Sequence, residues 1–348
     1  MKKKLLLISS YSVHLLNFYE LIKEYFDEIL IITNKYDNRF INHKVVNFSL
    51  LSTFKTSKVI SKEFDQFSPS IVHIHQANTV ALQTTLALKN KKIPLLLTFL
   101  GSDVLHTPNK SFLHKFLFKY STKKIQYFTS DSVYMAEIAQ TLMSENKKIL
   151  IANFGIKTDH NDQILKENIV YSNRLHKKFY RIDRIIDEFH RFRQSRINEN
   201  WKLVIGATGE ETDNLKKKVK QLDIESYVDF VGWLNNEQNS YFYNKSKIFV
   251  AIPENDATSI SLLEAMNAGC IPFVINVPSN REWILDGCNG VLINDVNSNF
   301  LDNIDNLNLD LLKDVNRKMI ESKGTIAVNK KRFFDFYEEI LVQFKTNA

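Results

Sequence analysis

Short apolar runs alternate with longer amphipathic stretches along all 348 residues of this chain. Such alternation is typical of β-strands joined by helices, and it predicts a parallel α/β fold. Expected strands are 5–9, 28–33, 71–75, 95–99, 127–130 and 149–151 in the first half, and 169–172, 202–206, 228–231, 248–251, 271–275 and 290–293 in the second. Expected helices include 15–25, 57–67, 80–89, 182–193, 210–222, 237–245 and 259–268.

The length and the pattern together predict two domains of similar size. A chain of 348 residues is long for one compact domain. A polar loop at Phe154–Asp162 lies near the centre, where a linker is expected. We therefore predict domains at 1–160 and 161–327. A last helical stretch within 328–348 could pack on the second domain or cross back to the first.

Composition excludes several classes of protein. No apolar run reaches the roughly 18 residues that a membrane-spanning helix needs. The apolar segment Leu5–Ile8 is too short for a signal peptide and predicts a buried strand. Cys270 and Cys288 are the only cysteines, which argues against a disulfide scaffold or a cysteine metal site. A G-x-G-x-x-G fingerprint is absent, which argues against a nicotinamide dehydrogenase. We expect a cytoplasmic protein.

Positive charge is concentrated in the first half. Residues 1–160 carry a net charge of +9, and residues 161–348 a net charge of −2. A basic domain suggests an anionic partner such as a membrane surface. We expect no nucleic acid, because no helix-turn-helix, zinc-finger or RNP-like motif occurs. Residues 109–124 mix five lysines with apolar side chains, which fits a basic amphipathic helix on a bilayer, or a core helix with a solvated basic face.

The segment Asp256–Glu264 carries the clearest chemical signal. It follows an apolar strand and a polar turn and leads into a helix, so it is expected at the carboxyl edge of the sheet, where α/β proteins bind ligands. A helix N-terminus attracts phosphate, and carboxylates can accept hydrogen bonds from sugar hydroxyls. Alternatively, Ser261 and Glu264 form a capping box that only completes the helix's own hydrogen bonds.

Several motifs together resemble the family 4 retaining glycosyltransferases, also called group 1 glycosyltransferases. They are Tyr171–Arg174, Phe230–Trp233, Asp256–Gly269 and Pro278–Trp283 in the second half, with Val72–His75, Gly101–Asp103 and Asn153–Gly155 in the first. The resemblance implies a GT-B fold, in which two facing Rossmann-like domains with parallel sheets enclose an interdomain cleft. It also implies an acceptor-binding first domain and a nucleotide-sugar-binding second domain.

The resemblance implies a donor site in the second domain. Asp256 would hold hydroxyls of the transferred sugar, and Glu264 the ribose hydroxyls. Arg174 would grip the diphosphate and stabilise it as it departs; its alternative role is a surface ion pair. The family's usual lysine is replaced by Tyr180, so Lys178 is the candidate for that charge. The remaining expected donor contacts come from residues around the helix start and from a glycine, namely Ala257, Thr258, Ser259, Ser261, Leu262 and Gly232.

The acceptor side of the resemblance rests on three residues of the first domain. His14 matches a position at the floor of the cleft, and His75 ends a strand. Asp103 is the nearest acid and could orient the acceptor hydroxyl. A structural histidine at 75 and helix capping by Ser102 or Asp103 are the alternatives. We accordingly predict catalytic roles for His14, Asp103, Arg174 and Asp256, and acceptor contacts for His14, His75 and Asp103.

The resemblance implies a retaining transferase that uses a UDP- or GDP-linked sugar, and we expect it to need neither a metal nor another cofactor. Its acceptor would be a glycan or a lipid-linked glycan in surface polysaccharide or lipopolysaccharide synthesis, reached from the inner face of the plasma membrane. The alternatives are a non-catalytic scaffold subunit of GT-B fold and a GT-B sugar epimerase.

Overall fold

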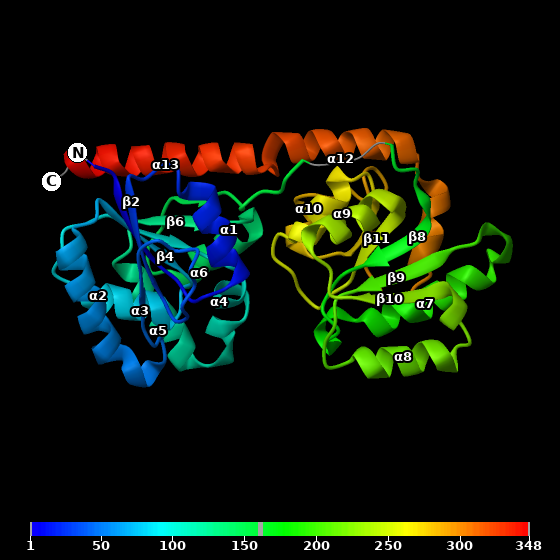
Figure 1. Ribbon diagram of the computed structural model, residues 1–348, viewed down its shortest axis with the longest axis horizontal. Coiled ribbons are helices and arrows are strands. Elements are labelled where there is room, and N and C mark those ends of the chain that lie inside the picture. Colours follow the sequence, from blue (N-terminus) through cyan, green and yellow to red (C-terminus); the bar gives the residue numbers. More distant parts are fainter. Residues whose placement is uncertain (1, 159–162, 347–348) are drawn as a thin grey trace. The chain divides into compact units, whose positions relative to one another are not determined.

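The computed structural model describes residues 2–158 and 163–346. The chain forms two compact units (Figure 1). The first unit comprises residues 1–154 and 326–348, and the second comprises residues 155–325. The chain therefore passes from one unit to the other twice. The predicted boundary between residues 160 and 161 lies outside the described residues.

The first unit contains a sheet of seven parallel strands in the order β3-β2-β1-β4-β5-β6-β7. Its central strands are largely buried, because helices cover both faces of the sheet. The bounds are β1 Lys4–Ile8, β2 Glu28–Thr33, β3 His43–Val45, β4 Ile71–His75, β5 Leu95–Thr98, β6 Tyr127–Ser130 and β7 Ile149–Ile151.

Two groups of helices cover this first sheet (Figure 1). One face carries α1 and the last helix of the chain, and these share a core with β1 and β2. The other face carries α2, α3, α5 and α6, whose apolar side chains form a second core. The bounds are α1 Val13–Ile22, α2 Thr53–Phe67, α3 Thr79–Ala87, α4 Ser102–Leu105, α5 Phe112–Lys123, α6 Val133–Leu142 and α13 Ile326–Thr346.

The second unit contains a sheet of six parallel strands in the order β10-β9-β8-β11-β12-β13. The bounds are β8 Glu167–Ser172, β9 Lys202–Gly206, β10 Val228–Gly232, β11 Ser246–Ala251, β12 Ile271–Ile275 and β13 Val291–Ile293. Because all strands run the same way, their carboxyl ends and the loops that follow them share one edge of the sheet.

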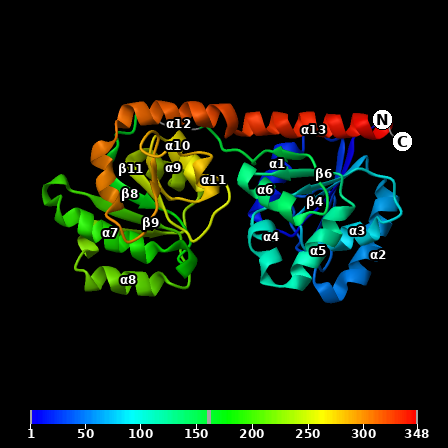
Figure 2. The same ribbon diagram turned by 180° about the vertical axis from the view of Figure 1, so that it is seen from behind.

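Helices also cover both faces of the second sheet (Figure 2). The helices α7 and α8 pack on one face. The helices α9 and α10 pack on the other, where α12 contacts α10. The bounds are α7 Ile182–Gln194, α8 Thr212–Gln221, α9 Asn236–Lys245, α10 Ile260–Asn267, α11 Pro278–Arg281 and α12 Leu309–Lys323. No helix in the described part of the chain combines the length and apolarity needed to cross a bilayer.

Candidate active site

The predicted donor residues lie where the connections of the second sheet change direction. Strand β8 pairs with β9 on one side and with β11 on the other. The chain leaving β8 proceeds through α7 to β9, and the chain leaving β11 proceeds through α10 to β12. Diverging loops open a crevice outside the carboxyl ends of such strands. Arg174 follows β8 and Asp256 follows β11, so both belong to this edge.

The guanidinium of Arg174 joins these loops. It donates from Nη1 to the Ser259 hydroxyl at 2.8 Å, and Nη2 lies 3.0 Å from the Asp256 carboxylate. The ring of Tyr180 stacks beneath it, 4.8 Å from the guanidinium carbon. The side chains of Arg174 and Asp256 are only 15% and 16% exposed. These contacts hold the largely buried guanidinium of Arg174 in place, so the alternative of a surface ion pair does not apply.

The start of α10 differs from the predicted capping box. Ser259 is the N-cap, and its hydroxyl accepts a hydrogen bond from the Leu262 amide. Since α10 begins at Ile260, Ser261 and Glu264 are not at the N-cap and N3 positions, and the capping-box interpretation is wrong. The Ser259 oxygen thus accepts both from the helix and from Arg174, which couples the arginine to the helix N-terminus.

Glu264 lies one turn further along α10, against a buried polar network. Its carboxylate lies near the Tyr243 hydroxyl, which accepts a hydrogen bond from the side-chain amide of Asn173 at 2.7 Å. Asn173 in turn donates to Asn239 at 3.0 Å. The network borders one side of the Glu264 carboxylate. Sequence reasoning did not identify Tyr243 or Asn239, because both lie in an ordinary helical pattern with no motif.

Burial governs the charge state of both acids. It raises the pKa of the Asp256 carboxyl, an effect that the neighbouring Arg174 opposes. It also raises the pKa of Glu264, and the Tyr243 hydroxyl opposes that rise. Burying a carboxylate away from water costs free energy, and a hydrogen-bond donor that replaces the lost water lowers this cost. Both acids are therefore suited to accepting hydrogen bonds from hydroxyl groups.

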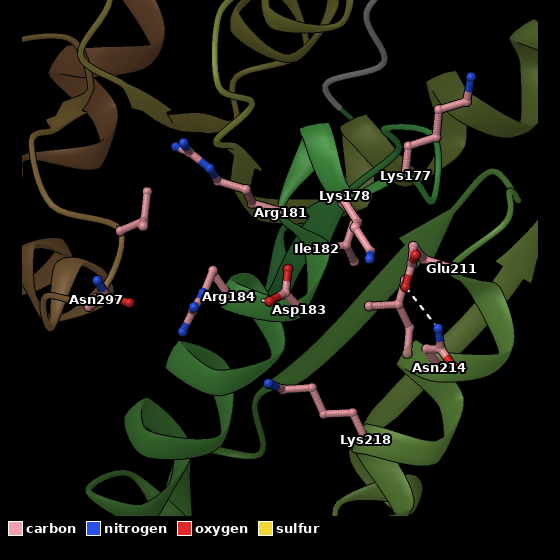
Figure 3. A pocket seen from close by; sticks show the side chains of 12 residues that line it. Lys177, Lys178, Arg181, Ile182, Asp183, Arg184, Glu211, Asn214, Lys218 and Asn297 are labelled. Atoms are coloured by element: carbon pink, nitrogen blue, oxygen red, sulfur yellow. Dashed lines mark hydrogen bonds and ion pairs between the residues drawn. The ribbon is translucent and has the colours of Figure 1, made fainter.

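Tyr180, Lys178 and Gly232 occupy different parts of the same edge. Tyr180 stands where the family's lysine is expected, and it contacts Arg174 through its ring face. Lys178 lines a separate cavity beside α8, shown in Figure 3. Gly232 ends β10 with φ of +72°, and its carbonyl accepts from Ala207 at 2.7 Å. The predicted donor contacts of Lys178 and Gly232 stay predictions.

In the first unit, the rings of His14 and His75 both lie near Phe154. Each ring centroid is 6.2 Å from that of Phe154. His14 is exposed, whereas His75 is fully buried against Phe18. Neither ring nitrogen of His75 has a hydrogen-bond partner among the described residues. Its burial favours the structural alternative over an acceptor contact, while His14 is available to solvent.

Asp103 connects two loops of the first unit. It is 2% exposed, and its carboxylate accepts from the Ala77 amide at 2.7 Å and from the Leu100 amide at 3.0 Å. Burial raises the pKa of this carboxyl, and these backbone donors oppose the rise. It does not cap α4, whose N-cap is Gly101. The geometry favours a positioning role, since both carboxylate oxygens already have partners.

Two parallel α/β units with charged loops at the sheet edge are the arrangement of a GT-B glycosyltransferase. Solved structures with this fold include HepE from Anabaena in complex with UDP, at 12% identity and TM-score 0.81. That match covers 97% of this chain and 100% of HepE. A glycosyltransferase from Rickettsia africae matches at 14% identity and TM-score 0.81, over 98% and 99% of the two chains. The lipopolysaccharide outer core galactosyltransferase WaaB matches at 14% identity and TM-score 0.69, over 96% and 99%.

Family models identify the chain more closely. The model described as "Glycosyl transferases group 1" matches residues 157–322, and the model described as "Glycosyl transferase 4-like" matches residues 3–132. The chain belongs to the group 1 glycosyltransferases. A protein of Haemophilus influenzae named as an uncharacterized glycosyltransferase is 32% identical over 90 residues. That match spans 24% of this chain and only 25% of the relative.

The described residues contain no cluster of three or more His, Cys, Asp or Glu side chains arranged to hold a metal ion. The predicted lack of a metal stays a prediction.

Proposed function

We propose that this protein transfers a hexose from a UDP- or GDP-linked donor to a glycan or lipid-linked acceptor, with retention of anomeric configuration and without a metal. The observation that supports it most is the contact of Arg174 with both Ser259, the N-cap of α10, and Asp256. A cation at a helix N-terminus suits a diphosphate, and an adjacent carboxylate suits sugar hydroxyls. HepE, which shares the fold, was solved with UDP and with UDP and glucose.

Donor binding would change the partners of Arg174. A diphosphate is a stronger partner for the guanidinium than the Ser259 hydroxyl, and its oxygens would share the arginine with Asp256. Asp256 would then accept hydrogen bonds from the sugar, and Glu264 from the ribose. Main-chain groups of Ala257, Thr258, Ser261 and Leu262 would line the diphosphate. Arg174 is thus placed to stabilise charge that develops on the leaving group.

The transfer itself would take place on one face of the sugar. The bond from C1 to the diphosphate oxygen breaks, the acceptor oxygen bonds to C1 on the same face, and the acceptor proton passes to the departing phosphate. Arg174 supplies the positive charge that another enzyme could draw from a metal. Asp256 is tied to Arg174 at 3.0 Å, which makes it a binding group and a poor nucleophile. These features support a retaining mechanism without a covalent intermediate.

Calorimetry with UDP and with GDP tests the donor site. We expect Arg174→Ala to weaken binding of the preferred nucleotide by roughly 10-fold to 100-fold, because a charge-assisted pair with phosphate is lost. Glu264→Ala should weaken binding of the nucleotide, whereas Glu254→Ala, an exposed acid two residues before Asp256, serves as the control. If neither nucleotide binds the wild type, the scaffold alternative gains support. Hydrolysis of nucleotide sugars, followed by sugar analysis, separates transfer from epimerisation.

The exposed surface of helix α5 supports the proposal that the acceptor is bound to a membrane. Its outer face exposes Phe112, Leu113, Phe116 and Tyr120, at 87%, 57%, 55% and 42%. These positions form one stripe along the helix, opposite the buried residues Phe118, Ser121 and Thr122. The helix therefore has a buried face and, beside its lysines, an exposed apolar face. An exposed apolar stripe of this kind marks an interaction surface.

Charge indicates what contacts this stripe. Residues 109–124 contain five lysines and no acid, and all five lysines are exposed. Each lysine near an anionic lipid surface contributes about 1 kcal/mol. Lysines beside partly inserted aromatic rings are the pattern of an interfacial helix. We propose that α5 holds the first unit on the anionic cytoplasmic face of the plasma membrane, where lipid-linked acceptors lie.

Sedimentation with vesicles tests the membrane proposal. Wild-type protein should bind vesicles that contain phosphatidylglycerol, and should bind pure phosphatidylcholine weakly. Phe112→Ser with Phe116→Ser should lower the binding about 10-fold or more, because two aromatic side chains no longer enter the bilayer. Leu165→Ser, which changes a side chain 84% exposed in the second unit, is the matched control. Equal binding by all three proteins would contradict the proposal.

A further inference from the structure

A cavity of about 560 Å³ lies beside the loop that follows Arg174. It is bounded by Lys177–Arg184, by the first half of α8 and by Val296 and Asn297 after β13. All of these residues belong to the second unit. The volume falls within the range of small-molecule sites, which is about 300–1,000 Å³. None of Arg174, Asp256, Ser259 or Glu264 lines this cavity.

The lining of the cavity is predominantly basic, with five cationic and two acidic side chains. Two of the cations have carboxylate partners: Lys218 pairs with Asp187 at 2.7 Å, and Arg184 lies 3.5 Å from Asp183. Lys177, Lys178 and Arg181 have no carboxylate partner within the part of the chain that the structure describes. Like charges so close in the chain repel one another, and a bound anion would relieve that repulsion.

Polar groups accompany the cations around the opening. Figure 3 shows Lys178 and Lys218 extending toward the space between Asp183 and Asn214, whereas Lys177 extends away from it. Asn214 donates to the Glu211 carboxylate at 2.9 Å, which leaves the other carboxylate oxygen for a ligand hydroxyl. Both α7 and α8 begin at this cavity without a side-chain cap.

The loop between Arg174 and α7 separates this cavity from the donor residues. Its buried side chain His176 bonds with the Gly206 carbonyl at 3.0 Å and with Thr212 at 2.8 Å, which fixes the loop against β9 and α8. Tyr180 packs on Arg174, while Lys178 lines the cavity. The loop therefore presents Tyr180 to the donor residues and Lys178 to the cavity. The cations that line the cavity and Arg174 can therefore bind different ligands.

We propose that this basic cavity is a second ligand site, which takes a small phosphate monoester that carries hydroxyl groups, such as a sugar phosphate. Lys178 and Lys218, which both extend toward this space, hold the phosphate. Asn214 and Glu211 hold the hydroxyls. This assignment moves Lys178 from the donor diphosphate to the cavity. It does not depend on the proposed transferase activity, because Arg174 and Asp256 take no part in it.

Calorimetric titration with glucose 6-phosphate tests the site in the full-length protein. Binding should persist in Arg174→Ala and should not be displaced by excess UDP or GDP. Glucose alone should not bind. Lys178→Ala combined with Lys218→Ala should weaken binding roughly 10-fold or more, because two charged donors to the phosphate are lost.

Lys217→Ala is the matched control, since it removes an exposed lysine next to Lys218 that does not line the cavity. Circular dichroism establishes that each variant is folded. Loss of glucose 6-phosphate binding in Arg174→Ala would place the phosphate in the donor site and overturn the proposal. An equal effect of Lys217→Ala, or no effect of the double variant, would overturn it too. Failure of UDP and GDP to bind would count against the transferase proposal alone.

Discussion

His75 shows how burial sets the acid response of a single residue. Desolvation in its aromatic surroundings lowers its pKa from 6.5 to about 3. The folded protein thus keeps this ring neutral at pH values where the unfolded chain protonates it. The stability that His75 contributes is complete above pH 6.5 and is lost as the pH falls from 6.5 toward 3.

We expect His75→Phe to reduce the acid sensitivity of the first unit. At pH 5, protonation of His75 in the unfolded chain costs the wild type roughly 2 kcal/mol, and phenylalanine cannot take up that proton. Phenylalanine also fits the surrounding rings without leaving unpaired nitrogens. The measurement is urea unfolding of both proteins at pH 7 and pH 5. An equal loss of unfolding free energy in both would show that the ring is not sheltered.

Arg174 shows how far the role of a single residue can be predicted from the sequence. The family resemblance implied a phosphate contact for Arg174, which stays a prediction, and the structure places its guanidinium against Asp256 and Ser259. Its stacking on Tyr180 could not be predicted, because a missing lysine does not say what its replacement touches. Likewise, the carboxylate of Asp103 has main-chain partners from two loops that are distant in the sequence.

At the scale of elements, the loop from Arg174 to α7 depends on a close approach of two backbones. A Cβ atom at Gly209 would lie 2.4 Å from the carbonyl oxygen of His176. Since a main-chain atom cannot swing aside as a side chain can, the loop has to move. Gly209 therefore supports the whole segment that carries Arg174, Lys178 and Tyr180.

We expect Gly209→Ala to lower the free energy of unfolding by about 1–3 kcal/mol, the usual cost of overpacking. It should also weaken nucleotide binding, because Arg174 begins the displaced loop. Gly287→Asn is the control: Gly287 has φ of +72°, which asparagine tolerates, and nothing lies within 4 Å of a Cβ there. Chemical unfolding and calorimetry check both effects. Unchanged stability in Gly209→Ala would mean that the two loops separate easily.

Strand prediction succeeded where burial is two-sided and failed at an edge. Runs such as Leu5–Ile8 and Ile271–Ile275 are fully apolar because helices cover both faces of the sheet. The short strand β3, His43–Val45, has one apolar residue in three and was not predicted. It forms because its backbone pairs in parallel with β2, with Ile31 opposite His43. Such an edge strand is set by its neighbour and not by its own composition.

At the scale of the whole molecule, the last helix completes the unit that the first residues begin. Phe333, Phe336, Tyr337 and Ile340 of α13 are buried among residues of β1 and α1. The Tyr337 hydroxyl bonds with His73 at 2.7 Å, and His73 bonds with Thr98 at 2.7 Å. The polar groups inside this core therefore also depend on α13.

We expect removal of residues 326–348 to unfold the first unit and spare the second. Burial of the four large side chains contributes roughly 6–12 kcal/mol, which is comparable with the total stability of a typical domain, about 5–15 kcal/mol. Thermal unfolding should show the loss of one transition, while nucleotide binding by the second unit persists. A milder variant, Tyr337→Phe, should cost about 1–2 kcal/mol through the lost hydrogen bond. A fully folded truncated protein would contradict this assignment of α13.

The late arrival of α13 bears on how the protein is made. A ribosome that adds about 5–20 residues per second needs roughly 10–35 s to synthesise residues 155–325 after the first stretch has emerged. Throughout that interval the apolar surface of β1 and α1 lacks its permanent cover. The nascent chain is therefore exposed to premature association, and a chaperone that shields this face until translation ends should raise the yield of native protein.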